Sequence, residues 1–521
     1  MLSRLRIDWL LLAAFAMHLA VVLPLVWLLP AYIDEVYSIR TASHSVWESL
    51  KLGVTFERQA PIYFGVLNVW CRINNSIEFA RIFSVVCTLA TMWVSANLSR
   101  ELFVRVPSAT LALLLALHPT VLFAATECRV YALEIFLVAL LLNVFAKLFL
   151  LNQQSAAKLV ALSLLAALSM YTQYHIGFLL LGLAVALLAS GRIREARNFV
   201  ACMVGTAILI IPILTWLTSQ LHQPDGSTSS RFTAGETIRF ATGLVRTFLF
   251  PAAMHLVPSA SNSPIERCVS LGVQSIVVLF VFAAFFAIHK SGKAIRQSAA
   301  FFWCCLFVTM AALLAMAGAV GGRLLVLFPR YWVGLVIPSC LATLALLADL
   351  GSMKVLAISV LFYLTTDAGD AWSHYRSPAK YGDSIRVAKY IQENEADDQP
   401  IVVFPNQHAA ALSLYYHGRN PLVPLPKPVR FDKFDMRDDS MQSEAQITAA
   451  LSQVDGLSRS VWLVFEPFDG GREARFHPEY VSAYFGRCYR TIKSRAFFNG
   501  LVVRQLAPME NTSNCGLPNT H

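Results

Sequence analysis

The sequence is poor in charged residues and lacks the patterns of several soluble protein classes. Only 14% of its 521 residues are Asp, Glu, Lys or Arg, whereas 56% are hydrophobic. Soluble domains carry about a quarter charged residues, so this composition excludes an ordinary soluble protein. The net charge of +10 comes without a basic stripe interleaved with aromatic residues, so nucleic acid binding is not indicated. The composition instead predicts a polytopic membrane protein.

The sequence also lacks CxxC motifs, internal repeats and low-complexity tracts. Its ten cysteines lie mostly in or beside apolar runs. We interpret most of them as small apolar core residues. Cys488 and Cys515 form a candidate disulfide pair if the C-terminal segment lies outside the cytoplasm.

Long apolar runs account for most of the first 370 residues. A bilayer takes about 20 apolar residues to cross. The first run follows the basic start MLSRLR and is too long for the core of a signal peptide, so we interpret it as a retained helix. About eleven spans are predicted: residues 8–30, 78–98, 107–125, 131–150, 158–172, 174–190, 199–219, 269–288, 298–319, 331–349 and 353–370.

Basic residues set the predicted orientation of these spans. With the N-terminus in the cytoplasm, every short inside connection is basic, including the runs at residues 191–197 and 289–296. An odd number of spans then puts the C-terminal segment outside. The predicted fold class is a polytopic α-helical membrane domain over residues 1–370, followed by a small extracytoplasmic soluble α/β domain over residues 371–521.

Local sequence patterns predict the secondary structure of the segments outside the spans. In the first outer loop, Ser45 and Glu48 have capping-box spacing and residues 61–73 mix apolar and polar side chains, so both predict short interfacial helices. In the C-terminal segment, residues 384–394 predict a helix and residues 401–404 and 461–465 predict buried strands. Asn499-Gly500 predicts a hairpin. The pairs Asp397-Asp398 and Asp438-Asp439 are interpreted as solvated loop charges.

An acidic pair, Asp34-Glu35, follows the first span directly. Pro30 closes that span, and the pair comes at the membrane surface. A carboxylate just past a helix C-terminus lies at the negative end of the helix dipole, which is unfavourable for a structural charge. We therefore interpret the pair as functional.

Four more polar clusters fall on the same predicted outer face. Ionisable residues at membrane depth are costly and usually face a cavity or a partner, so their convergence predicts a site. Structural alternatives stay open: Glu127 and Arg129 would pair with each other, Arg330 would anchor at the interface, and the tyrosines would form an aromatic belt. The clusters are Glu57-Arg58-Gln59-Ala60-Pro61-Ile62-Tyr63, Glu127-Cys128-Arg129-Val130-Tyr131, Tyr171-Thr172-Gln173-Tyr174-His175 and Arg330-Tyr331-Trp332.

The five clusters, in this order and on this face, resemble those of the GT-C glycosyltransferases over about residues 1–370. The likeness is to bacterial relatives of protein O-mannosyltransferases and of the lipid A aminoarabinose transferase. The C-terminal segment is similar in layout to the small periplasmic domain of such enzymes. The chain departs from the pattern at Gln59 and Ala60, where many members have a lysine before the proline, and at Gln173, where some have histidine.

The resemblance implies a multi-pass enzyme of the bacterial cytoplasmic (inner) membrane that transfers a hexosyl or pentosyl group. Its donor would be a polyprenyl-phosphate sugar, and its acceptor a hydroxyl of a lipid, glycan or protein at the outer face. By similarity, Asp34 would be the general base and Glu35 would orient the acceptor or tune Asp34. The remaining candidates would bind donor phosphate or sugar: Arg58, Tyr63, Glu127, Arg129, Tyr131, Arg330 and Tyr331.

Direct attack on the anomeric carbon would invert its configuration. The outer face has no DxD motif, so no metal or other cofactor is indicated, although a divalent ion held by acidic and His residues stays open. Three other functions are alternatives. A flippase for a lipid-linked sugar would show internal repeats and polar mid-span residues. A ligase or polymerase of diphosphate-linked oligosaccharides would show a late large outer loop, and a membrane-anchored sensor would need only one or two spans.

Overall fold

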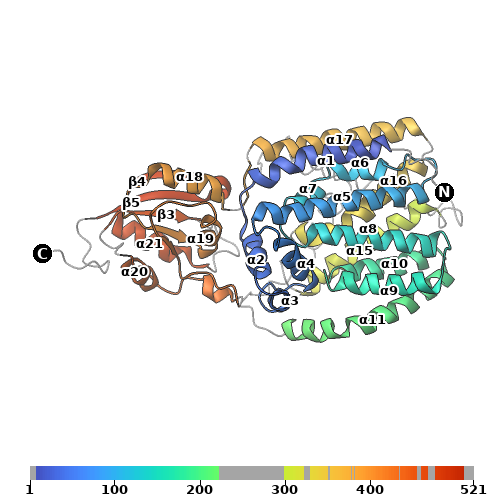
Figure 1. The fold of residues 1–521 in the computed structure, drawn as a ribbon, viewed down its shortest axis with the longest axis horizontal. Coiled ribbons are helices and arrows are strands. Elements are labelled where there is room, and N and C mark those ends of the chain that lie inside the picture. The colour runs from blue at the N-terminus through green and yellow to red at the C-terminus, as the bar shows by residue number, and fades with distance from the viewer. Residues whose placement is uncertain are drawn as a thin grey trace.

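The protein has a bundle of long helices at one end and an α/β unit at the other (Figure 1). The computed structural model describes residues 8–221, 298–321, 329–349, 352–376, 378–380, 382–432, 435–454, 459–466 and 476–509. Three short helices, α2 (Ile33–Ala42), α3 (Val46–Thr55) and α4 (Ile62–Cys71), lie at the end of the bundle that faces the α/β unit.

Most predicted spans coincide with helices. In the described part of the chain, five helices are long and apolar enough to cross a membrane, at Trp9–Leu28, Ile77–Leu102, Tyr131–Leu150, Ile193–Ile213 and Trp332–Asp349, so the protein is a multi-pass membrane protein. The predicted span 269–288 lies outside the described residues, and the total of eleven is not confirmed. The bundle elements are α1 (Trp9–Leu28), α5 (Ile77–Leu102), α6 (Thr110–Ala116), α7 (Pro119–Ala125), α8 (Tyr131–Phe145), η1 (Ala146–Leu150), α9 (Ala156–Met170), α10 (Ile176–Ala189), α11 (Ile193–Leu221), α15 (Ala299–Gly321), η4 (Pro329–Leu335), α16 (Val336–Asp349) and α17 (Met353–Arg376).

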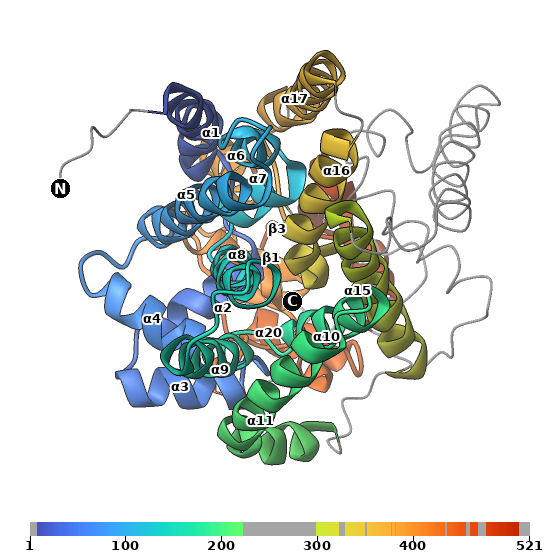
Figure 2. The same ribbon diagram turned by 90° about the vertical axis from the view of Figure 1, so that its right-hand side faces the viewer.

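The view along the bundle shows α8 among the other helices (Figure 2). Its residues Ile135, Leu142 and Phe145 are fully buried. The ring of Phe145 packs against three other phenylalanines, on η1, α11 and α15. A helix that is apolar on nearly all sides belongs in the interior of the protein, and α8 is such a helix apart from the buried Glu134 and Asn143.

The predicted span 107–125 is not one continuous helix. It is divided into α6 and α7 by Leu117 and His118. Pro119 has no backbone N–H and its ring clashes with a preceding helical turn, so it starts α7 instead of continuing α6. The His118 side chain accepts a hydrogen bond from the Thr120 N–H, 3.2 Å away, and so caps the new helix.

The first outer loop contains one helix more than the sequence predicted. The predicted helices are present as α3, where Ser45 Oγ accepts from the Glu48 N–H at 3.3 Å, and as α4. α2 was not predicted, because its residues show no marked apolar periodicity. The Asn68 side chain on α4 donates to the carbonyls of Ala42 and His44, at 2.7 and 2.6 Å, and ties the end of α2 to α4.

The α/β unit contains a five-stranded sheet in the order β2-β1-β3-β5-β4. β2, β1 and β3 are parallel, whereas β5 is antiparallel to β3 and to β4. Alternate residues of β1 and β3 pack on opposite faces, against α18 and α19 on one side and α20 and α21 on the other. The elements are α18 (Ser384–Asn394), β1 (Ile401–Phe404), α19 (Asn406–Leu412), β2 (Leu422–Pro424), η5 (Met436–Asp439), α20 (Ala445–Ser452), β3 (Val461–Phe465), α21 (Pro478–Cys488), β4 (Tyr489–Ala496), η8 (Phe498–Gly500) and β5 (Val502–Pro508).

The predicted helix 384–394, both predicted strands and the hairpin are confirmed by these elements. The turn is a short 3-10 segment that ends at Gly500, whose φ of +80° suits glycine. Cys488 is disulfide-bonded; its predicted partner, Cys515, lies outside the described residues. α17 runs to Arg376, and the boundary between residues 370 and 371 stays a prediction.

The α/β unit packs against α2 and α3 through α19 and the segment after β2. Ala411 is buried in a cluster with Ile33, Val36 and Leu52. The Phe431 ring meets the rings of Tyr37 and Phe56 at 5.8 and 6.3 Å, and the Arg40 guanidinium lies 5.6 Å from its centre. The Tyr415 hydroxyl accepts from the Ala31 N–H at 2.7 Å. The two parts of the chain are therefore in direct contact at α2.

We expect Phe431→Ala to loosen this contact, because aromatic pairs contribute about 0.5–1.5 kcal/mol beyond their buried area. Tryptic cleavage after Lys380 in the connection between the two parts should become about fivefold faster, which is the rate equivalent of about 1 kcal/mol. The control is Phe497→Ala, since Phe497 packs on Tyr390 within the α/β unit. Equal cleavage rates in the two variants would contradict the prediction.

Candidate active site

Asp34 and Glu35 lie in the first turn of α2, whose N-cap is Tyr32. The expectation that the helix dipole opposes them is therefore wrong. α1 ends at Leu28, the chain is extended at Leu29, and α2 begins at Ile33. Both carboxylates follow the negative end of the α1 dipole, but they also lie at the positive end of the α2 dipole. The positive end of a helix dipole stabilises a negative charge.

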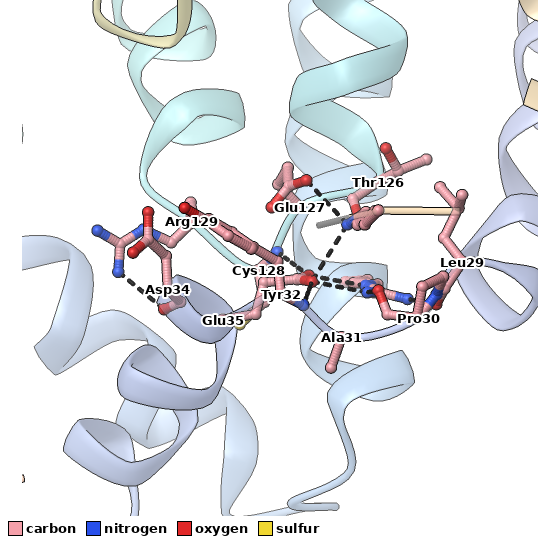
Figure 3. Close-up of polar contacts among 12 residues, drawn as sticks. Leu29, Pro30, Ala31, Tyr32, Asp34, Glu35, Thr126, Glu127, Cys128 and Arg129 are labelled. Atoms are coloured by element: carbon pink, nitrogen blue, oxygen red, sulfur yellow. Dashed lines mark hydrogen bonds and ion pairs between the residues drawn. The ribbon is translucent and has the colours of Figure 1, made fainter. Parts of the chain in front are cut away.

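Glu35 is fully buried and forms a bidentate ion pair with Arg81 of α5. Its Oε1 accepts from Arg81 Nε at 2.8 Å and from the Cys128 N–H at 2.9 Å. Its Oε2 accepts from Arg81 Nη2 at 2.7 Å and from the Tyr32 N–H at 3.0 Å, so it also caps α2 (Figure 3). Burial alone would raise the pKa of Glu35, but the charges of Arg81 and Lys380 hold it well below the usual range.

Arg81 also joins the end of α1 to the start of α2. Its Nη1 donates to the carbonyls of Val26 and Leu29, both at 2.8 Å, and its Nη2 donates to the Pro30 carbonyl at 2.9 Å. The Val26 carbonyl lies in the last turn of α1 and the other two lie just past its C-terminal end, where a cation is favourable. Arg81 was not among the predicted site residues, although a charge inside an apolar span was the signal that could have identified it.

A second buried carboxylate, Glu127, is held by Lys380. Lys380 Nζ lies 2.8 Å from Glu127 Oε1 and 3.1 Å from Glu35 Oε2, and it donates to the Thr126 carbonyl at 2.9 Å. Burial raises the pKa of Glu127 to about 7, an effect that Lys380 opposes and the charge of Glu35 increases. Lys380 lies more than 250 residues from Glu127 in the sequence, and no local pattern identified it.

Arg129 pairs with Glu57 and not with Glu127, so the structural alternative of a Glu127–Arg129 pair is wrong. Arg129 Nη1 lies 2.7 Å from Glu57 Oε2 and 2.8 Å from Ser38 Oγ. The same nitrogen donates to the backbone carbonyl of Asp34 at 2.9 Å (Figure 3). Burial raises the pKa of Glu57, whereas the Arg129 charge lowers it.

Asp34 differs from the neighbouring carboxylates in its exposure. The side chains of Glu35, Glu57 and Glu127 are 0%, 2% and 7% exposed and each is ion-paired. Asp34 is partly exposed, and its charge acts on Arg129 and Glu57. Within this cluster, Asp34 is therefore the carboxylate with the most access from solution.

The other predicted site residues lie around this cluster. Arg58 follows Glu57, is half-buried and has a φ of +54°. Tyr63 on α4 is buried, with its hydroxyl 3.7 Å from Cys128 Sγ. Tyr131 is buried at the start of α8, with its ring 5.3 Å from that of Phe123.

The late predicted cluster is described only in part. The backbones of Arg330 and Tyr331 are in η4, but their side chains lie outside the described residues. Trp332, next in the chain, is buried. Among the residues that the structure describes, no group of three or more His, Cys, Asp or Glu side chains is arranged to hold a metal ion.

Part of this region matches a known protein family. Residues 58–216 match the family model described as "Dolichyl-phosphate-mannose-protein mannosyltransferase". This match confirms the predicted resemblance to the GT-C superfamily of membrane glycosyltransferases. The matched residues include Arg58, Tyr63 and the loop with Glu127 and Arg129.

No curated protein matches the chain. Among solved structures, the crystal structure of ArnT from Cupriavidus metallidurans bound to undecaprenyl phosphate is similar at 14% sequence identity, with a TM-score of 0.38, over 97% of this chain and 99% of that one.

We expect Arg81→Met to destabilise the protein by about 3–5 kcal/mol, because it leaves the Glu35 carboxylate buried without its main partner. Arg81→Met combined with Glu35→Gln should recover part of the loss. Thermal unfolding in detergent measures both changes. Lys51→Met is the control, since its pair with Glu48 is exposed and worth at most about 1 kcal/mol. A similar small effect of Arg81→Met and Lys51→Met would contradict the prediction.

Proposed function

We propose that the protein transfers a sugar from a polyprenyl-phosphate donor to a hydroxyl acceptor at the outer face of the bacterial cytoplasmic membrane. The family model that matches residues 58–216 is described by a lipid-phosphate sugar donor, which supports a donor of this class. The N-terminus would lie inside and the α/β unit outside. The observation that carries the proposal is the partly exposed Asp34 beside three buried, ion-paired carboxylates.

Asp34 is the proposed general base. A base must be reached by the hydroxyl whose proton it takes, within about 3 Å. The Glu35 side chain is fully buried and already accepts several hydrogen bonds, so it suits a supporting role rather than proton transfer. Arg129 donates to the backbone carbonyl of Asp34 and so fixes this residue next to a cation.

In the proposed reaction, Asp34 takes the proton of the acceptor hydroxyl as its oxygen attacks the anomeric carbon. The new glycosidic bond forms while the bond from that carbon to the phosphate oxygen breaks, with inversion of configuration. The polyprenyl phosphate leaves with the electron pair of the broken bond. Guanidinium groups suit the negative charge that grows on the phosphate, and Arg58, Arg129 and Arg330 are the candidates.

The distribution of charge favours an enzyme over a flippase. A flippase needs polar groups near the midplane of the membrane, along the path of its cargo. Here the described acidic cluster lies where α2 and the loop before α8 meet, at the end of the bundle facing the α/β unit (Figures 1 and 3). We therefore rank the flippase, and the ligase of diphosphate-linked oligosaccharides, behind the transferase.

We expect Asp34→Asn to lower transfer about 10²- to 10⁴-fold, the usual contribution of general base catalysis, and to leave donor binding intact. Purified protein in nanodiscs would be given a panel of polyprenyl-phosphate sugars with acceptor extracts, and release of free polyprenyl phosphate would be measured. Glu48→Gln, an exposed carboxylate on α3, is the matched control and should keep full activity.

Three results would count against the proposal. Turnover that survives Asp34→Asn would exclude Asp34 as the base and direct attention to Glu127. Donor binding without turnover by the wild-type protein, with every acceptor extract, would favour the flippase. Turnover only with diphosphate-linked oligosaccharides would favour the ligase.

We expect Arg58→Ala to raise the KM for the donor about tenfold or more, because a hydrogen bond to a charged group contributes about 1.5–3 kcal/mol. Arg72→Ala removes an exposed arginine at the end of α4 and serves as the control. Steady-state kinetics with varied donor concentration separates this effect from a change in kcat. An unchanged KM in Arg58→Ala would remove Arg58 from the phosphate site.

A further inference from the structure

We propose that Lys380 is a positioning residue for Asp34, and that through it the docking of the α/β unit controls the geometry of α2. This inference rests on the proposed role of Asp34. Lys380 lies in the short connection between α17 and α18, outside both the helical bundle and the sheet. None of the five polar clusters in the sequence contains it.

The contacts of Lys380 saturate its ammonium group. An ammonium group has three donors, and Lys380 Nζ has three acceptors: Glu127 Oε1, Glu35 Oε2 and the Thr126 carbonyl. The side chain is only 11% exposed. A lysine in this state is not available to bind a donor phosphate, so a role in holding the carboxylates fits it better.

Charge balance explains why a cation is needed there. Two carboxylates, Glu35 and Glu127, are buried close enough for each to affect the other. Arg81 makes a bidentate pair with Glu35, and Lys380 makes an ion pair with Glu127. Without Lys380, Glu127 would be left as a buried charge without its ion-pair partner, which is strongly unfavourable.

The effect reaches Asp34 through a short series of bonds. The Glu35 oxygen that accepts from Lys380 also accepts from the Tyr32 N–H, and Tyr32 is the N-cap of α2. Asp34 is the second residue of that helix. A shift of Glu35 would therefore move the start of α2 and change the direction of the Asp34 carboxylate.

The α/β unit also contacts the segments on either side of this network. Two residues after Lys380, Gly382 has a φ of +87° and packs so closely on His408 of α19 that a Cβ would lie 2.7 Å from His408 Nδ1. Tyr415, just past α19, accepts from the Ala31 N–H. Two consecutive N–H groups before α2, those of Ala31 and Tyr32, are thus bound by Tyr415 and by the Glu35 oxygen that Lys380 holds.

The test compares Lys380→Met and Lys380→Arg with the wild-type protein, full-length and in nanodiscs. The control, Lys389→Met, removes an exposed lysine of α18. Kinetics at saturating donor give kcat, and varied donor gives KM. Hydrogen exchange of the amides of residues 31–36, without donor, reports on the start of α2 independently of activity.

We expect Lys380→Met to lower kcat about 10- to 100-fold, since small misplacements of a reacting group have effects of this size. The KM for the donor should stay within about twofold of its wild-type value, and exchange at residues 31–36 should become faster. Lys380→Arg should restore much of the kcat, and Lys389→Met should change nothing. If Lys380→Met does not fold, Tyr415→Phe should show smaller changes in the same direction.

A fall in thermal stability with unchanged kcat and unchanged exchange would overturn the inference, because it would mean that Lys380 only stabilises the fold. A raised KM with unchanged kcat would also overturn it and make Lys380 a donor-binding residue. If the wild-type protein shows no transfer while exchange at residues 31–36 still responds to Lys380→Met, the proposed function fails and the coupling to α2 stands.

Discussion

The ion pair between Glu35 and Arg81 is the interaction on which the site depends. Neither side chain is exposed, and a buried charge is tolerated only when it is paired and fully hydrogen-bonded. Arg81 meets this condition with the carbonyls at the end of α1, and Glu35 meets it with two backbone N–H groups and two cations. The pair therefore fixes where α1 ends, where α2 begins and how the loop before α8 approaches them. Replacing a whole buried ion pair by apolar residues can leave the free energy of unfolding nearly unchanged. We therefore infer that this pair matters because it positions α1, α2 and the loop before α8, and not because it adds net stability.

Neighbouring acidic residues acquire different properties from this arrangement. Successive residues of a helix point about 100° apart, so Glu35 can face the protein interior while Asp34 faces the accessible side. Glu35 keeps its charge because cations and N–H groups surround it, whereas burial raises the pKa of Glu57 and of Glu127. Perturbed carboxylates beside an accessible one are common at catalytic sites. Of the acidic pair, Glu35 is thus a structural residue and Asp34 is the candidate for proton transfer.

The α/β unit contributes to the same site. It packs against α2 and α3 through α19, Tyr415 and Phe431, and the connection to it supplies Lys380. Asp439, interpreted from the sequence as a solvated charge, is instead buried and accepts from the Gln407 side chain at 3.0 Å. Its charge acts on Tyr37 of α2. The α/β unit is therefore packed directly against α2, the helix that carries Asp34 and Glu35.

The sequence by itself determined the class of the protein and most of its elements. Apolar runs predicted the helices of the bundle, because crossing a membrane requires long apolar segments, and β-rich runs predicted β1, β3 and the hairpin. The sequence also predicted that Asp34, Glu57, Glu127 and Arg129 lie on the same outer face of the membrane domain. Only the tertiary structure showed which cations pair with the acidic residues. Glu35 forms ion pairs with Arg81, which lies in an apolar span, and with Lys380, which is hundreds of residues away in the sequence. The tertiary structure also decided that Asp34 and Glu35 start a helix. Burial and long-range pairing set these outcomes, and neither leaves a periodic signal in the chain.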